Sequence, residues 1–154
     1  AFSDTTNGWA VGGSGIILGT HDGGATWYLV QPAVTGLTLN GAWRLSNDVA
    51  WVVGAAGAKL RTTATADSFA WSAGSFGASN DMRALMFVDD LTAYTVGANG
   101  GGIVFQTLDG GTTWTQQLAN SAQALNAVWF VDVMRGWAVG DQGRIVHTSS
   151  GGNQ

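Results

Sequence analysis

Carboxylates are the side chains of this 154-residue sequence best suited to hydrolytic chemistry. The chain has ten Asp and no Glu, and Asp89-Asp90 is its one adjacent acidic pair. Cleavage of a glycoside needs two carboxyl groups at a defined separation, one of them with a raised pKa. The Asp residues stand mostly in turn-like stretches, and their spacing marks no such pair. The acidic residues therefore do not indicate a catalytic site.

The other reactive residue types are equally scattered. His21 and His147 are the only histidines, and the chain has no Cys, so ligands for a metal site are too few and disulfides are excluded. The stretch GGSGIILG at residues 12–19 superficially matches a dinucleotide loop. That motif needs a helix after its glycines, whereas β-like runs flank these. We expect no enzymatic activity, no cofactor and no metal.

Composition limits the class of protein and its partners. The chain is 45% hydrophobic and only 10% charged, with 24 Gly and one Pro, which is typical of a turn-rich all-β domain. Its length suits one domain. A net charge of −4 with six Lys and Arg argues against nucleic acid as a partner. No apolar run approaches the ~20 residues of a membrane span.

One phrase, an aromatic residue followed by two small or β-branched residues and Gly, occurs four times. Its glycines are 42, 43 and 43 residues apart. The copies are Trp9–Gly12, Trp51–Gly54, Tyr94–Gly97 and Trp137–Gly140. Around them, other positions recur at fixed offsets, including Asp4, Ser46, Asp89 and Asp132. We therefore divide the chain into repeats of approximately 1–36, 37–79, 80–122 and 123–154.

Each complete repeat holds four short β-like runs separated by Gly, Asp and Asn turn signals. No repeat contains ten residues with helical spacing. Four antiparallel strands in about 43 residues is the dimension of a β-propeller blade. The sequence predicts an all-β propeller, or half of one, with about four blades per chain and incomplete blades at the two ends.

The phrase Thr-x-Asp-Gly-Gly-x-Thr-Trp occurs twice, at the expected hairpin between the third and fourth strands. Its defining residues are Thr20, Asp22, Gly24 and Trp27, and then Thr107, Asp109, Gly111 and Trp114. The Asp side chain can accept hydrogen bonds from the backbone of its own turn, and the glycines can adopt positive φ. We expect these residues to hold the hairpin together.

The two other copies of this phrase are degraded. The second keeps only Asp67 and Trp71, and the fourth has Ser150 at the position of the Asp. Such decay would disable two of four sites if the phrase carried chemistry. It is tolerable if the phrase only stabilises hairpins, so the degradation favours the structural interpretation.

The phrase is identified as the Asp-box motif and resembles the repeats of sialidases, sortilin-type receptors and xyloglucanases. The fuller pattern in residues 2–27 and 130–148 looks like the photosystem II assembly and stability factor family and its bacterial relatives. That resemblance spans the chain and implies a non-enzymatic, exported scaffold that holds a protein partner. A xyloglucanase-like site could use two Asp, but a sialidase-like site needs an arginine cluster and a Tyr with a Glu partner. The arginines do not recur at one repeat position, and Glu is missing.

The eight tryptophans suggest a second possibility, because stacked sugars favour aromatic platforms. Every Trp occupies a repeat position, which favours packing between blades. A carbohydrate-binding propeller, or a non-catalytic fragment of a sialidase-like or xyloglucanase-like glycoside hydrolase, stays open as the alternative to a protein-binding scaffold. A glycan is then the possible ligand.

Three polar residues at equivalent positions are the candidate binding site. Asn40, Arg83 and Asn126 each stand three residues before a large apolar residue, at the start of the expected innermost strand. Innermost strands of a propeller begin or end at its central channel. We therefore expect these side chains at the mouth of the channel, unless they merely satisfy loop backbone.

The two ends of the sequence do not complement each other. Ala1 already stands at the position of Trp43, and Gln154 corresponds to Thr26, so strands two and three occur in both end copies. Because the two end copies do not complete each other, we expect the chain to be a processed protein or a piece of a longer propeller. The alternative is a homodimer in which two chains join head to tail into a ring of about eight blades.

Overall fold

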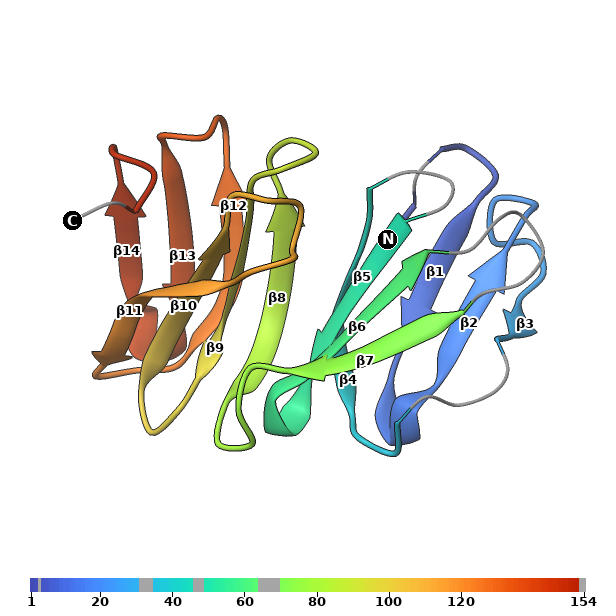
Figure 1. Ribbon diagram of the computed structural model, residues 1–154, viewed down its shortest axis with the longest axis horizontal. Coiled ribbons are helices and arrows are strands. Elements are labelled where there is room, and N and C mark those ends of the chain that lie inside the picture. The colour runs from blue at the N-terminus through green and yellow to red at the C-terminus, as the bar shows by residue number, and fades with distance from the viewer. Residues whose placement is uncertain (3, 31–34, 46–48, 64–69, 153–154) are drawn as a thin grey trace. The chain divides into compact units, whose positions relative to one another are not determined.

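The computed structural model describes residues 1–2, 4–30, 35–45, 49–63 and 70–152, and within them it contains four antiparallel sheets. In every sheet the spatial order of the strands follows the sequence (Figure 1). The sheets coincide with the four repeats, and we call them blades 1 to 4. This arrangement confirms the predicted all-β fold of consecutive antiparallel blades.

The strands are short, as the spacing of turn signals predicts. Blade 1 contains β1 (Gly8–Val11), β2 (Ile17–Thr20) and β3 (Tyr28–Leu29). Blade 2 contains β4 (Leu39–Arg44), β5 (Val49–Gly54), β6 (Ala58–Thr63) and β7 (Trp71–Ser75). Blade 3 contains β8 (Asp81–Phe87), β9 (Ala93–Ala98), β10 (Gly102–Thr107) and β11 (Thr115–Ser121). Blade 4 contains β12 (Leu125–Phe130), β13 (Gly136–Gly140) and β14 (Ile145–Thr148).

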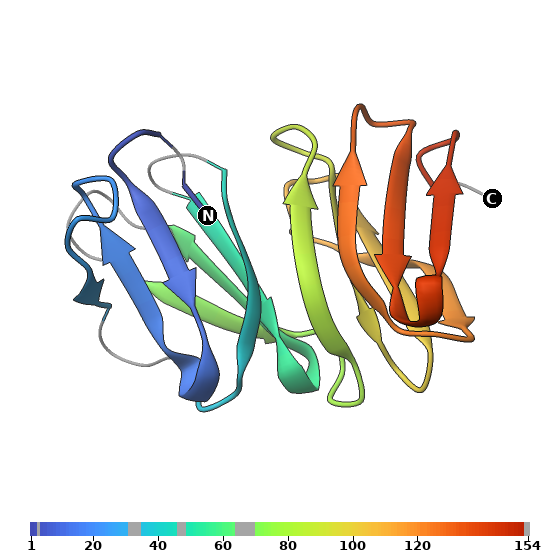
Figure 2. The ribbon, with the colours of Figure 1, turned by 180° about the vertical axis from the view of Figure 1, so that it is seen from behind.

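The two end blades are incomplete in different ways. In the described residues blade 1 has three strands, and its innermost strand is represented by a bridge between Phe2 and Gly8. Blade 4 also has three strands, and in the described residues nothing pairs with the outer edge of β14. Figure 2 shows β14, in red, beside β13 at the edge of blade 4.

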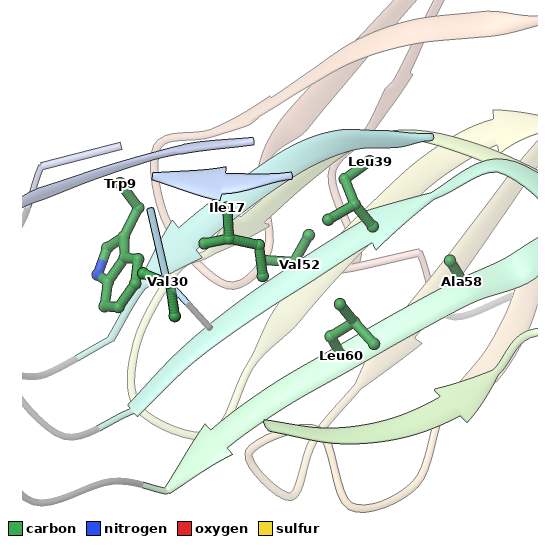
Figure 3. Packing of buried hydrophobic residues seen from close by; sticks show 7 residues of the cluster. All are labelled: Trp9, Ile17, Val30, Leu39, Val52, Ala58 and Leu60. Carbon is green, nitrogen blue, oxygen red and sulfur yellow. The ribbon is translucent and has the colours of Figure 1, made fainter. Parts of the chain in front are cut away.

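The chain divides into two compact units, Ala1–Ala78 with blades 1 and 2, and Ser79–Gln154 with blades 3 and 4. In unit 1, β1 packs beside β4. Trp9 and Ile17 of blade 1 meet Leu39, Val52 and Leu60 of blade 2 in a buried cluster (Figure 3). This apolar contact between two sheet faces is the core of the unit, because each face alone would expose its side chains to water.

Unit 2 is built in the same way around β12, which packs beside β8 and β9. Its buried cluster joins Val96 of blade 3 to Leu125 and Ala138 of blade 4. The rings of Tyr94 and Phe130 stack with their centroids 3.7 Å apart and an interplanar angle of 7°. Equivalent repeat positions therefore form the contact between blades in both units.

In three blades, steric crowding explains why the aromatic-x-x-Gly phrase ends in glycine. A Cβ atom on Gly54, Gly97 or Gly140 would lie 2.1, 2.0 and 2.0 Å from a backbone carbonyl oxygen at the start of the innermost strand. Gly54 and Gly140 have extended φ angles of −167° and −153°, which any residue can adopt. Glycine is needed here because the neighbouring strand's carbonyl oxygen leaves no room for a Cβ atom. Gly12, in the blade without an innermost strand, has nothing within 4 Å of its Cβ position.

Candidate functional site

The three candidate binding residues all lie at irregularities of the innermost strands. The β4–β5 register shifts between Leu39 and Gly41, on either side of Asn40. The same shift brackets Arg83 in β8 and Asn126 in β12. Such a β-bulge interrupts the regular register of the strand pair and turns a side chain in a new direction. The repeat therefore places these three side chains at equivalent bulges.

The structure brings two of the three candidates together. Arg83 Nη1 donates a hydrogen bond to Asn126 Oδ1. Asn126 Nδ2 in turn donates to Asp141 Oδ1 at 2.7 Å, and Arg83 Nη1 lies 3.7 Å from Asp141 Oδ2. We call these three residues the Arg83 cluster. The third candidate, Asn40, is exposed and belongs to unit 1.

Asp141 is a member of this cluster that the sequence analysis missed. It begins the short 3₁₀ turn Asp141–Gly143, directly after the repeated glycine of blade 4. The corresponding residues of the other copies are Gly13, Ala55 and Ala98. A charged residue at a position that is small and apolar in the other repeats was the signal that could have revealed it.

The Arg83 cluster remains open to solvent. The side chains of Arg83 and Asp141 are 34% and 52% exposed. A guanidinium group carries five N–H donors. The amide oxygen of Asn126 and the carboxylate of Asp141 use only some of the donors of Arg83. The cluster can therefore still bind an acceptor group such as a carboxylate or a backbone carbonyl.

The eight defining residues of the repeated Thr-x-Asp-Gly-Gly-x-Thr-Trp phrase lie in the β2–β3 and β10–β11 hairpins, where Thr20 and Thr107 are the last residues of β2 and β10. In the second of these loops, Thr107 Oγ1 donates to Asp109 Oδ1 at 2.8 Å. The hydroxyl and backbone N–H of Thr113 donate to the same carboxylate at 2.6 Å and 2.8 Å. Gly111 N–H donates to the Thr107 hydroxyl at 2.9 Å. One exposed carboxylate and one buried hydroxyl thus connect both sides of the loop.

The loop of blade 1 repeats this geometry around Asp22. Its carboxylate accepts the Thr26 hydroxyl at 2.6 Å and the Thr26 N–H at 2.9 Å, and Thr20 donates at 2.8 Å. Hydrogen bonds, mainly from Thr26 and to a lesser extent from Thr20, lower the pKa of Asp22 to about 2. Bonds from Thr113 and then Thr107 lower the pKa of Asp109 to about 2 as well. Both carboxylates are therefore ionised and engaged at neutral pH.

The tryptophans that end the two phrases differ in their surroundings. Trp114 is half-buried, and its indole N–H donates to the Gly111 carbonyl at 3.0 Å. Trp27 is 41% exposed and meets the ring of Phe2 edge-on, with the centroids 6.1 Å apart.

The fourth copy keeps the loop without the carboxylate. Gly152 N–H donates to the Thr148 hydroxyl at 2.8 Å, and Ser150 N–H donates to it at 3.1 Å. Gly151 and Gly152 have φ angles of 67° and 82°, close to the 68° and 89° of Gly110 and Gly111. The loop conformation therefore forms without the carboxylate, with the Ser150 hydroxyl 3.5 Å from the Thr148 hydroxyl. The degraded second copy cannot be compared, because Asp67 lies outside the described residues.

Another recurring acidic position has a local role that the sequence analysis did not assign. Asp89 Oδ1 accepts the N–H groups of Leu91 and Thr92 at 2.8 and 2.6 Å. Asp4 and Asp132 make the same bonds in the hairpins of blades 1 and 4. Their carboxylates fix the turn between the first two strands of a blade. Ser46, at the same position of blade 2, lies outside the described residues.

The histidines contribute no cluster of metal ligands. His21 Nδ1 lies 2.7 Å from Asn7 Oδ1, and its Nε2 lies 2.7 Å from the Tyr28 hydroxyl, on the surface of blade 1. In the part of the chain that the structure describes, no three His, Cys, Asp or Glu residues group together. No helix in those same ranges is long and apolar enough to cross a membrane.

Comparison with known proteins gives solved structures only. No family model matches the chain, and no curated protein matches it. A structure of YCF48 bound to D1 peptide is 18% identical with a TM-score of 0.64, over 99% of this chain and 65% of that one. YCF48 from Cyanidioschyzon merolae is 16% identical with a TM-score of 0.71, over 100% of this chain and 53% of that one.

An enzyme is also among the similar structures. The GH74 enzyme of Niastella koreensis is 16% identical with a TM-score of 0.68, over 95% of this chain and 28% of that one. The chain thus spans about half to two thirds of the YCF48 structures. At these identities the likeness concerns the fold, and the protein has the β-propeller fold with incomplete end blades.

Proposed function

We propose that the chain is a non-enzymatic binding or assembly scaffold that holds a protein partner on a propeller face. The observation that carries this proposal is its likeness, over 99% of its length, to a YCF48 structure bound to a peptide. An exported location accompanies such a role in the family that the sequence resembles. The same likeness supports the Asp-box assignment of Asp22 and Asp109, whose hydrogen bonds are confined to their own loops.

The Arg83 cluster is the proposed contact for the partner. Its arginine lies at a β-bulge of an innermost strand, keeps free donor capacity and is one third exposed. A segment with carbonyl or carboxylate oxygens would complete the hydrogen bonds of the guanidinium group. Asn40 occupies the equivalent bulge in unit 1, and it is the proposed polar contact of that unit.

The test is a triple variant, Asn40→Ala, Arg83→Ala and Asn126→Ala, used as bait with chemical crosslinking and mass spectrometry. Arg144→Ala is the matched control, because it removes one exposed arginine of the same unit outside the cluster. We expect the triple variant to fold and to lose the partner that the wild type captures, while the control keeps it. Normal capture by the triple variant would refute the proposed contact.

A carbohydrate-binding propeller, or a fragment of a sialidase-like or xyloglucanase-like glycoside hydrolase, is the second candidate, and the likeness to the GH74 structure is compatible with it. It predicts turnover of a fluorogenic glycoside, or a change of Trp fluorescence when a sugar binds. The scaffold predicts neither. Either positive result would replace the first candidate.

We also propose that further blades cover the end of blade 4, supplied by a second chain or by a longer propeller. Trp129, Trp137, Val139 and Ile145 are all exposed there. Tyr94 and Val96 occupy the positions of Trp137 and Val139 in blade 3 and are only 1% and 0% exposed. Large exposed apolar patches mark interaction surfaces. Light scattering should find a dimer of the 154-residue chain, and a stable monomer with a cooperative melt would contradict dimerisation.

A further inference from the structure

Four residues of blade 1 differ in type from their counterparts in blade 3 and lie close together on the surface of blade 1. They are Asn7, Gly19, His21 and Tyr28, and their counterparts in blade 3 are Thr92, Gln106, Leu108 and Thr115. At the positions of His21 and Tyr28 blade 2 has Thr63 and Ser72. The blade architecture therefore does not require a histidine and a tyrosine at these two positions.

The Tyr28 ring is directed toward His21 by a glycine. Tyr28 begins β3 and stands opposite Gly19 of β2. A Cβ atom on Gly19 would lie 2.6 Å from both the Cζ atom and the hydroxyl oxygen of Tyr28, so the phenol crosses β2 where only glycine leaves room. Its hydroxyl lies 2.7 Å from His21 Nε2. The two rings stack with their centroids 5.0 Å apart and an interplanar angle of 23°.

Asn7 and Asp4 determine which nitrogen of His21 carries the proton. Hydrogen bonds from the Asn7 side chain, and then from the backbone N–H groups of Asn7 and Thr6, hold the pKa of Asp4 well below its ordinary value. Asp4 is thus ionised and can only accept hydrogen bonds. The Asn7 amide group therefore turns its NH₂ toward Asp4, where Nδ2 donates to Oδ2 at 2.9 Å.

The other end of the Asn7 amide is consequently its carbonyl oxygen, which lies 2.7 Å from His21 Nδ1. A carbonyl oxygen accepts a hydrogen bond, so this arrangement assigns the proton to Nδ1 in the neutral imidazole. The remaining nitrogen, Nε2, then accepts the hydrogen bond of the Tyr28 hydroxyl. The phenolic proton is directed at a base whose orientation a third residue fixes.

A hydroxyl, a base and a group that orients the base form the arrangement that activates oxygen nucleophiles in proteins. Both distances of 2.7 Å fall within the roughly 2.6–3.2 Å over which such groups exchange protons. Tyr28 is 36% exposed and His21 is exposed as well. A reagent can therefore reach the pair from solvent.

We propose that Tyr28 is an acylation site, at which the phenolic oxygen accepts an acyl group from an activated ester. The oxygen attacks the ester carbonyl carbon, a new C–O bond forms, and the bond from that carbon to the leaving oxygen breaks. The phenolic proton passes to His21 Nε2 and from there to the leaving group or to water. The leaving group must be a weaker base than phenolate, as nitrophenolate is, because the reverse reaction otherwise prevails.

This inference goes beyond the proposed function. The acylation site belongs to unit 1, shares no residue with the Arg83 cluster and needs no protein partner. The triple variant of Asn40, Arg83 and Asn126 should accept the acyl group as fast as the wild type does. Failure of one proposal therefore leaves the other standing.

The experiment treats the 154-residue protein with p-nitrophenyl acetate and locates acetyl groups by mass spectrometry of proteolytic peptides. Acetylation of Lys59 in the same spectra is the internal reference, since no variant changes that residue. We expect an acetyl group on Tyr28, and Tyr28→Phe should remove it. Absence of an acetyl group from Tyr28 of the wild type would overturn the proposal.

Histidine variants test the base. His21→Gln keeps the phenol and should slow acetylation of Tyr28, relative to Lys59, by about tenfold or more. His147→Gln is the matched control, because it removes the other histidine of the chain and should leave the rate unchanged. An equal rate in His21→Gln and wild type would show that His21 is not the base.

Asn7 is a positioning residue, and its role has a signature that a merely structural contact lacks. Nitrogen-15 NMR of the wild-type protein should find His21 with its proton on Nδ1. Asn7→Ala should move that proton toward Nε2 and slow acetylation of Tyr28, because Nε2 then no longer accepts from the phenol. A wild-type proton on Nε2, or a changed tautomer with unchanged acetylation, would contradict the proposed arrangement.

Discussion

The contacts between blades in the two units use the same repeat positions but different chemistry. In unit 1 the contact is aromatic, with Trp71 edge-on to the buried Trp9. In unit 2 Tyr94 replaces that Trp, and its hydroxyl donates to the Gly151 carbonyl at 2.8 Å. Gln106 Nε2 donates to the Tyr94 hydroxyl at 2.8 Å and to the same carbonyl at 3.0 Å.

The repeat therefore determines which positions form the contact between blades. The residue at each position then determines whether the contact is aromatic packing or hydrogen bonding. An indole ring fills space against a complete fourth strand. A phenol with a carboxamide neighbour instead makes directional bonds to the loop of a blade that has three described strands. The polar contact thus ties the hairpin loop of blade 4 to blade 3.

The largest expected effect is on the aromatic contact. Trp9→Ala removes a side chain that is 4% exposed and should lower the free energy of unfolding by about 3–5 kcal/mol, since it leaves a cavity in the core. Thermal unfolding followed by circular dichroism measures the loss. A decrease below about 1 kcal/mol would mean that the contact between blades 1 and 2 is not a tightly packed core.

The next effect tests the glycine that a blade with an innermost strand needs. Gly54→Ala places a Cβ atom 2.1 Å from the Thr38 carbonyl oxygen and should cost at least about 1–3 kcal/mol through forced backbone shifts. Gly12→Ala is the matched control, because its Cβ position is empty and its φ of −168° suits any residue. We expect the control to melt like the wild type. Similar losses in both variants would argue against the steric explanation.

The polar contact should respond to a smaller change. Tyr94→Phe keeps the ring stacked on Phe130 but removes the hydroxyl, so the Gln106 amide and the Gly151 carbonyl lose a partner. The expected loss is about 1–3 kcal/mol, the usual cost of an unsatisfied buried polar group. Unchanged stability in denaturant titrations would show that the two remaining groups satisfy each other.

The smallest effect concerns the loop that Tyr94 contacts. Ser150→Asp restores the carboxylate of Asp22 and Asp109 and should slightly raise the melting temperature at pH 7. A carboxylate whose folded pKa lies near 2, below the ordinary value of about 3.9, stabilises the protein above that ordinary value and loses the effect as pH falls toward 2. At position 150 the Thr148 hydroxyl is present as a donor, but Gln154 stands where Thr26 and Thr113 stand in the other copies. The gain should therefore disappear as pH falls below the ordinary Asp value of about 3.9. A gain that persists at pH 2 would exclude the carboxylate as its source.

The sequence allowed the blades and hairpins to be predicted, because both depend on residues close together in the chain. The spacing from Thr107 to Trp114 marks a hairpin loop in which the side-chain hydrogen bonds of Thr107 and Asp109 stay within the loop. One backbone bond leaves it, from Gly110 N–H to the Leu91 carbonyl. Contacts between blades were harder to predict. Arg83 and Asn126 are 43 residues apart, and their bond depends on how blade 4 stacks on blade 3. Asp141 was missed because it breaks the repeat, and a search for recurring positions passes over a residue found in one copy.

The glycine at the end of each phrase also bears on how such a chain can be rearranged. Its steric constraint joins two strands of the same blade, since Gly97 faces Asp81 and Gly140 faces Ala124. Both residues of the close contact therefore stay together when the segment that encodes a whole blade is duplicated, deleted or moved. A cassette of about 43 residues that begins before the innermost strand carries both partners of the close contact. A cut between them would separate the carbonyl from its glycine, so gene-level shuffling and protein engineering should favour joints outside that interval.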